Sequence, residues 1–337
     1  MSALKKTVSI LALIFCFSSA ILADELKPEL KFSGLIFGQA VFFMGNSETD
    51  TGGALGSFSA FDIPRVYLNT EAKLDDKITA FVQLEANKIS VDQWSSAAVD
   101  KTPYIKQANI KIKDIYPGAT LSLGQIPMPW RGLEEGVWKH RFVSKVSEDI
   151  EGFTNAVDRG VGLKGKCMQD KIEYDALIVN GEGANNETNK YKDFIGRITF
   201  APGNVAGLKL HLYGHKGDYD DGKLRNRTIF GISYESEKWN GMLNYYGGND
   251  KAKGVRGISL HGVFNLDEKK WVFGRYDNWD PDKDAADDKS ARFILGVGHK
   301  IASSVRGALS FQSLSREKET ATKKDRNALY YSVEVKF

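Results

Sequence analysis

The sequence predicts an all-β fold, a closed transmembrane β-barrel of about sixteen antiparallel strands. Three observations predict it. Apolar residues recur at every second position in segments of about ten residues, which is typical of strands with one apolar and one polar face. The connections between these segments are alternately short and long. Beyond the N-terminus no run approaches the roughly 18 apolar residues of a membrane helix, and a mean hydropathy of −0.33 suits strands that are apolar on one face only.

The last ten residues, ALYYSVEVKF, alternate without exception. One face would carry the candidate barrel-closing residues Leu329, Tyr331, Val333, Val335 and Phe337. The other face would carry Tyr330, Ser332, Glu334 and Lys336. A final strand that ends in phenylalanine resembles the closing strand of Gram-negative outer-membrane barrels, and this resemblance implies recognition by the barrel-assembly machinery. An edge strand of a soluble β-sandwich is the alternative.

The N-terminus is expected to be a cleaved signal peptide, residues 1–23, followed by a barrel domain, residues 24–337. Two lysines, an apolar core at residues 8–17 and a run of small residues appear in the order that secretory signals require. Cleavage would lower the basic count from 46 to 44 against 43 acidic residues, a balance that gives no reason to expect a nucleic-acid partner. It would also leave Cys167 as a single cysteine, so no internal disulfide is expected.

The clearest hairpin comprises residues 65–74 and 77–87. Each strand places apolar residues on one face and charged or amide residues on the other, over the length that crosses an outer membrane at a tilt. The other expected strands are residues 31–42, 104–113, 120–126, 159–166, 171–180, 193–201, 208–216, 227–235, 239–247, 257–265, 270–278, 292–301, 305–313 and 328–337. The total is even, as expected for single-chain bacterial barrels.

The connections separate into two classes. The expected short connections are residues 75–76, 114–119, 167–170, 235–238, 266–269 and 302–304. The expected long connections are residues 45–59, 89–103, 127–158, 181–192, 217–226, 279–291 and 314–325. Turns at one rim and loops at the other are typical of outer-membrane barrels, whereas a soluble sandwich has no reason to sort its connections in this way. Aromatic residues near the strand ends would form interfacial girdles, namely Tyr234, Trp239, Tyr245, Trp271, Tyr276 and Phe337.

The long connection at residues 127–158 is unusually rich in aromatic residues, which indicates that it packs against the rest of the protein. Residues 132–146 could form a short helix within it. The candidate residues of a pore constriction are Arg131, Glu134, Glu135, Lys139, His140 and Arg141. A loop that caps the barrel mouth or packs on a neighbouring subunit is the alternative.

Three sequence blocks resemble the phosphate-selective porin O and P family. They are LSLGQIPMPW at residues 121–130, DRGVGLKG at residues 158–165 and RYD at residues 275–277. The resemblance implies a porin barrel in which the long loop after the fifth strand folds inward and narrows the channel, and it implies a homotrimer. The lumen arginines and loop lysines associated with phosphate capture in this family are not matched, so the resemblance supports the fold more than the selectivity.

Strand parity places charged residues on the lumen face. The candidate lumen-wall residues are Arg65, Glu71, Glu85, Arg197, Lys209, Arg275, Asp277, Arg292 and Arg306. Basic residues outnumber acidic residues at the inward positions, which favours a mild anion preference. A neutral and weakly selective pore is the alternative.

Enzyme motifs are missing from the sequence, including HExxH, GxSxG and GxxxxGK[ST]. His211 and His215 share a strand face, but a spacing of four on a strand separates them by about 13 Å, which is too far for one metal ion. We therefore expect no enzyme activity, no cofactor and no metal.

The sequence as a whole predicts an outer-membrane porin, a water-filled channel for passive diffusion of small hydrophilic solutes or ions. Two alternatives stay open. One is a channel specific for phosphate or another anion, and the other is a structural or adhesive outer-membrane barrel with a plugged lumen.

Overall fold

The described residues form sixteen strands and two short helices in a computed structural model that describes residues 28–44, 59–87, 103–219, 223–251, 253–319 and 325–337. The predicted signal peptide lies outside these residues. The strands are β1 (Glu29–Met44), β2 (Ser59–Lys73), β3 (Ile78–Asn87), β4 (Tyr104–Lys113), β5 (Ala119–Pro127), β6 (Val157–Cys167), β7 (Ile172–Val179), β8 (Asp193–Phe200), β9 (Leu208–Asp218), β10 (Leu224–Glu235), β11 (Trp239–Asp250), β12 (Lys253–Asn265), β13 (Lys270–Asp280), β14 (Ser290–Ala302), β15 (Val305–Arg316) and β16 (Arg326–Lys336). Between β5 and β6 lie α2 (Pro129–Trp138) and α3 (Ser147–Ile150).

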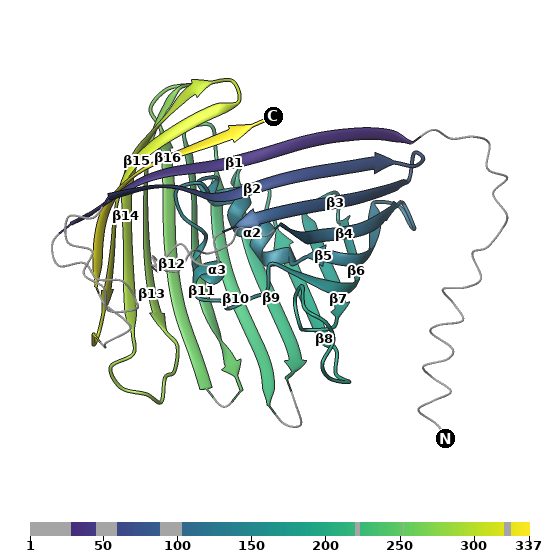
Figure 1. Cartoon of the computed structure of the whole chain (residues 1–337). Helices are drawn as coiled ribbons and strands as arrows, with labels where there is room; N and C mark the ends of the chain where they lie inside the picture. Colours follow the sequence, from purple (N-terminus) through teal and green to yellow (C-terminus); the bar gives the residue numbers. More distant parts are fainter. Residues whose placement is uncertain (1–27, 45–58, 88–102, 220–222, 252, 320–324) are drawn as a thin grey trace.

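Each strand pairs with its sequence neighbours in an antiparallel manner, and β1 pairs with β16 to close the sheet into a barrel (Figure 1). The closing pair runs from Leu35 opposite Lys336 to Met44 opposite Asn327. Beyond it, the Gly34 N–H donates to the Phe337 carbonyl at 2.7 Å. Closure removes both sheet edges, so backbone groups at membrane depth find partners. The predicted fold class is confirmed.

Side chains alternate between the outer face and the lumen along each strand. In β9, Leu210 and Leu212 are exposed on the outer face, whereas His211 and Tyr213 are buried inside. In β16, Leu329 is exposed outward and Ser332 is fully buried. This two-residue period places hydrocarbon-compatible side chains around the barrel and polar side chains within it.

The predicted aromatic girdle is wrong for one residue. Tyr234, Trp239 and Tyr276 are exposed on the outer face. Trp271, however, faces the lumen, where its indole lies over Gly298 of β14 and a Cβ on that glycine would lie 2.1 Å from the ring. The parity of β13 decides its direction, because Phe273 and Arg275 on the same face are buried inside the barrel.

The connection between β5 and β6, residues 128–156, folds into the barrel, and Figure 1 shows α2 and α3 inside it. We call this connection the constriction loop. The predicted helix at residues 132–146 is wrong in its bounds. Pro129 starts α2 in the first turn, where a missing N–H costs nothing. Lys139 ends it in the left-handed conformation, with φ 57°, and its N–H donates to the Glu135 carbonyl at 2.9 Å.

No helix among the described residues is both long enough and apolar enough to span a membrane. Cys167, at the end of β6, is an exposed free thiol.

Candidate functional site: the lumen and its constriction loop

The constriction loop crosses the lumen and is held by several strands. On one side, Gln39 of β1 and Gln312 of β15 donate to the Val143 carbonyl at 3.5 and 3.2 Å. Farther along the wall, Arg306 of β15 donates to the Lys139 carbonyl at 2.5 Å. On another side, the Tyr246 hydroxyl of β11 donates to the Glu134 carboxyl at 2.9 Å. Backbone carbonyls of the loop are thus paired by wall side chains, so the loop has a defined seat inside the barrel.

Aromatic packing explains the composition of the loop. Trp130 and Trp138 are fully buried between the loop and the wall. The Trp138 ring meets His261 and Phe273 with centroid distances of 5.2 and 5.9 Å. His140 stacks on Phe273 at 4.9 Å. These rings fill the lumen beside β11–β14, so this part of the barrel is a packed core.

Most charges of the loop pair with one another. The Arg131 guanidinium contacts Glu148 at 2.8 Å and Asp149 at 2.7 Å. Arg141 contacts Glu135 at 2.9 Å and also donates to the Tyr67 hydroxyl of β2 at 2.7 Å. Buried charges are tolerated because each has an opposite charge or hydrogen-bond partner. These residues hold the loop together.

Burial shifts the pKa values of two loop side chains toward their neutral forms. Burial, reinforced by the nearby Glu148 carboxyl, raises the pKa of Glu134 to about 8. Burial lowers the pKa of His140 to about 3, although its ring nitrogen contacts the Trp138 carbonyl, and the charges of Arg306 and Lys139 lower it further. Of the six candidate constriction residues, Lys139 is the exposed one, Glu135 and Arg141 are partly buried, and Arg131, Glu134 and His140 are buried.

The α2 residues that line the neighbouring cavity, Pro129, Gly132 and Leu133, carry no charged side chain. Gly132 and Gly136 are exposed, and Pro129 and Leu133 are partly exposed. A Cβ on either glycine would meet nothing within 4 Å. These residues recur at helical spacing, three and four apart. The sequence analysis missed these residues because it selected only charged side chains of the loop as candidates. The spacing of Gly132 and Gly136, four residues apart, indicated a helix face without side chains.

Opposite this face lies a cavity of about 390 Å³ bounded by α2 and β4–β8, which we call the α2 cavity. Its charged lining residues are Lys111, Lys164, Glu173, Asp175 and Arg197. Arg197 lies 2.5 Å from Asp175 and 3.5 Å from Glu173, so it pairs with both acids, although its single positive charge balances only one of them. Within the described part of the chain, neither lysine ammonium lies within ion-pair distance of a carboxylate. The cavity therefore joins an apolar helix face to a wall whose charged side chains carry a net charge of +1, with Lys164 opposite Asp175 in the β6–β7 register but in no ion pair among the described residues.

Comparison with known proteins identifies the family. Residues 44–269 match the profile of the family described as phosphate-selective porin O and P. The chain belongs to this family of porins. The predicted family and the predicted function are thereby confirmed, and the protein is an outer-membrane porin, a channel for passive diffusion. No curated protein sequence is significantly similar to the chain.

Solved porin structures share the fold of this porin. In vitro folded OmpT of Vibrio cholerae, in its trimer form, is 12% identical with a TM-score of 0.57, over 92% of this chain and 99% of that chain. OmpF of Salmonella typhi in complex with daunomycin is 10% identical with a TM-score of 0.65, over 92% and 98%. A mutant Rh. blastica porin is 13% identical with a TM-score of 0.59, over 92% and 100%.

The candidate lumen-wall residues of the porin all lie on inward strand faces, mostly in ion pairs. Arg65 contacts Glu85 at 2.8 Å, Arg275 contacts Asp277 at 2.6 Å, and Arg306 contacts Glu334 at 2.6 Å. Two further members are also paired: Arg197 with acids of the α2 cavity and Lys209 with Glu235. Arg292 lies 3.9 Å from both Glu151 and Asp277. Glu71 is exposed to the lumen. Close pairing reduces the field that these basic residues exert in the channel.

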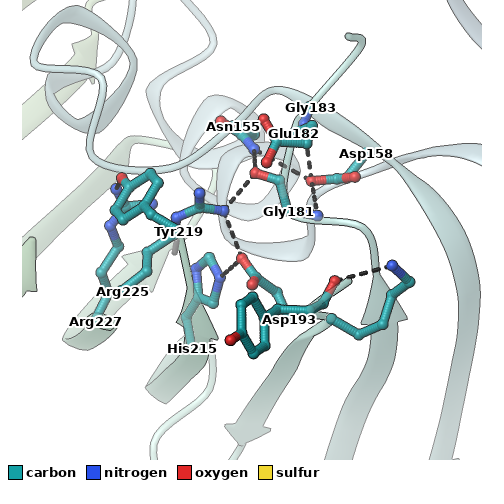
Figure 2. A network of polar contacts seen from close by, with 12 residues as sticks. Asn155, Asp158, Gly181, Glu182, Gly183, Asp193, His215, Tyr219, Arg225 and Arg227 are labelled. Carbon is teal, nitrogen blue, oxygen red and sulfur yellow. Dashed lines mark hydrogen bonds and ion pairs between the residues drawn. The ribbon is translucent and has the colours of Figure 1, made fainter. Parts of the chain in front are cut away.

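A second polar network fixes the place where the constriction loop rejoins the wall (Figure 2). The Asp158 carboxyl accepts from the backbone N–H groups of Gly181 and Gly183 at 3.1 and 3.0 Å. Nearby, the fully buried Asp193 carboxyl lies 2.7 Å from His215 and 2.6 Å from Arg225, and Arg225 also donates to the Gly181 carbonyl. This network joins the loop end to the connection between β7 and β8.

His211 and His215 of β9 do not form a shared metal site. His211 contacts the hydroxyls of Thr199 and Ser233, both at 2.9 Å, whereas His215 belongs to the network around Asp193. Across the described ranges, no cluster of three metal-ligating side chains occurs.

Proposed function

We propose that solutes cross this porin through the α2 cavity, and that Lys111 and Lys164 give the passage a mild preference for anions. The observation that carries the proposal is the state of charge compensation. The acids of the cavity are engaged by Arg197, while the two lysine ammonium groups have no carboxylate partner among the described residues. A net positive potential in a narrow, water-filled passage concentrates anions.

Reversal potentials of the refolded porin in a potassium chloride gradient test this proposal. Lys111→Gln combined with Lys164→Gln should shift the reversal potential toward cation preference, because the net charge of the cavity side chains then changes from +1 (three basic and two acidic residues) to −1. Lys209→Gln is the matched control, since that lysine already faces Glu235 at 3.3 Å, and it should shift the potential less. An unchanged reversal potential in the double variant would contradict the proposed pathway.

A phosphate-specific channel is the second candidate, and the description of the family favours it. Phosphate at low concentration should then compete with the chloride current. A structural or adhesive barrel would carry no steady current at all, so the same recordings separate the three functions.

We further infer that the porin assembles as a homotrimer, as the OmpT structure in its trimer form does. We also infer that residues 1–23 are a cleaved signal peptide, that the barrel-assembly machinery recognises the strand that ends at Phe337, and that the protein has no enzyme activity. Mass spectrometry of the protein from outer membranes would test the cleavage.

A further inference from the structure

We propose that the α2 cavity favours one class of solute, the small organic anion that has a carboxylate at one end and a hydrocarbon body at the other. This inference rests on the proposed function, because it assigns a solute class to the same passage. It differs from a general anion preference in requiring an apolar surface as well as positive charge.

The apolar side of the cavity is continuous. Pro129 and Leu133 of α2 lie partly exposed along it, and Ile126 and Leu177 line it from the wall. Gly132 lies between the two α2 side chains, and a Cβ there would enter open space. A hydrocarbon chain that slides along this face loses contact with water and gains dispersion contacts with the helix.

The polar side lies on the facing strands. Lys111 of β4 stands opposite Ser122 of β5, and Lys164 of β6 stands opposite Thr120 of β5, so the two lysines flank one strand. A carboxylate can receive charge-assisted hydrogen bonds from either ammonium group. Since Arg197 already occupies Asp175 and Glu173, a solute carboxylate would not displace an existing ion pair.

The two sides together distinguish between anions of equal charge. A fully hydroxylated anion can bind the lysines, but its hydroxyl groups lose water when they pass the α2 face and find no hydrogen-bond partner on that helix surface. An anion with a hydrocarbon body suffers no such loss.

Pentanoate and glycerate are the test pair, because they carry the same charge at neutral pH and have the same number of non-hydrogen atoms. Reversal potentials against chloride, measured on the refolded full-length mature porin in planar bilayers, give the permeability of each. We expect pentanoate to be about fivefold more permeant than glycerate, the ratio that corresponds to burying a few tens of square ångströms of hydrocarbon. A ratio of one or less would overturn the inference.

Variants locate the preference. Leu133→Gln should lower the pentanoate-to-glycerate ratio, whereas Leu133→Met should preserve it. Because Leu133 also packs against the loop core, a second pair avoids that contact. Gly132→Ser should lower the ratio, and Gly132→Ala, which fills almost the same space without a hydroxyl, should keep it. A ratio above one that neither Leu133→Gln nor Gly132→Ser changes would place the preference elsewhere and overturn the assignment.

Replacing the two lysines separates the effect of charge from the effect of the apolar helix face. Lys111→Gln with Lys164→Gln should lower the permeability of both anions relative to potassium and leave their ratio unchanged. A porin that conducts potassium chloride without discriminating pentanoate from glycerate would refute the solute class alone. A refolded barrel without steady current would refute the channel function itself.

Discussion

Glu134 is an acidic side chain that the fold holds in its neutral form. It is fully buried on α2. Its carboxyl accepts one hydrogen bond from the Trp130 indole at 3.1 Å and another from the Tyr246 hydroxyl of β11 at 2.9 Å. Burial and the neighbouring Glu148 carboxyl raise its pKa from 4.5 to about 8. Burial thus favours the protonated carboxyl between its two aromatic partners, although the charge of Arg275 acts in the opposite direction.

This raised pKa predicts a stability that declines with pH. A group whose folded pKa exceeds its unfolded pKa stabilises the fold fully below the unfolded value, here 4.5, and this contribution is lost as pH rises through about 8. The thermal midpoint in detergent should therefore fall between about pH 5 and about pH 9. Glu134→Gln should flatten that decline, whereas Glu71→Gln, at an exposed lumen position, should not. An equal decline in Glu134→Gln would contradict the assignment.

At the scale of single residues, the sequence predicted which face of a strand a side chain lies on better than it predicted which residues that side chain contacts. Strand parity alone placed Arg65, Glu85 and Arg275 on inward faces, because a two-residue period leaves two choices for each strand. The partner of Arg131 could not be predicted in this way. Glu148 lies seventeen residues away, and only the folded path of the loop brings the two together.

The constriction loop is the element that lies inside the barrel and packs against its wall. Trp138 holds the loop in place through two contacts. Its fully buried ring packs against His261 and Phe273 of the wall. Its indole N–H donates to the Ser144 carbonyl of the loop at 3.0 Å. These contacts therefore fix the loop to β12 and β13 and also fix one part of the loop to another.

Replacing this ring should open the channel. Trp138→Ala should weaken the seating of the loop by about 3–5 kcal/mol, the usual cost of removing a buried tryptophan side chain. Because the barrel wall is closed independently by β1 and β16, we expect an intact barrel with higher and noisier single-channel conductance. Trp239→Ala is the control, since that ring lies on the outer face and should leave conductance unchanged. Wild-type conductance in Trp138→Ala would show that the loop does not depend on this contact.

The helix inside the loop shows what sequence reasoning could and could not predict for an element. The aromatic density of residues 127–158 correctly indicated packing. The start of the helix was wrong because a local signal, the proline at position 129, was overlooked. Its end at the left-handed Lys139 could not be predicted, because lysine has no propensity for that conformation.

At the scale of the whole molecule, closure depends on long-range pairing between the two ends of the described chain. Phe337 donates its N–H to the Gly34 carbonyl at 3.1 Å and accepts the Gly34 N–H. Its ring lies against Gly34, where a Cβ would clash at 2.2 Å. The ring itself is 65% exposed, so it contributes little buried area.

Deleting Phe337 should therefore affect assembly more than stability. Loss of two backbone hydrogen bonds should lower the free energy of unfolding by about 2 kcal/mol, visible as a small fall in the thermal midpoint in detergent. Phe337→Ala keeps the backbone bonds and should be closer to the wild type. In cells, both variants should give less heat-modifiable barrel in the outer membrane if the assembly machinery reads the aromatic end. Normal cellular yield in both would contradict that role.

Helix α2 lies closer to one side of the barrel wall than to the other, and this position limits where the pore lining can be altered. The helix packs toward β11 and β12, while β4–β8 line the α2 cavity on its other side. The strands on the cavity side are not all free of the loop, because Leu177, Val179 and Ile195 of β7 and β8 belong to the same core as Trp130. Redesign for new solutes can therefore be confined to the cavity positions outside that core, such as Lys111 and Lys164, where altered side chains would change transport and leave the packing of the loop intact.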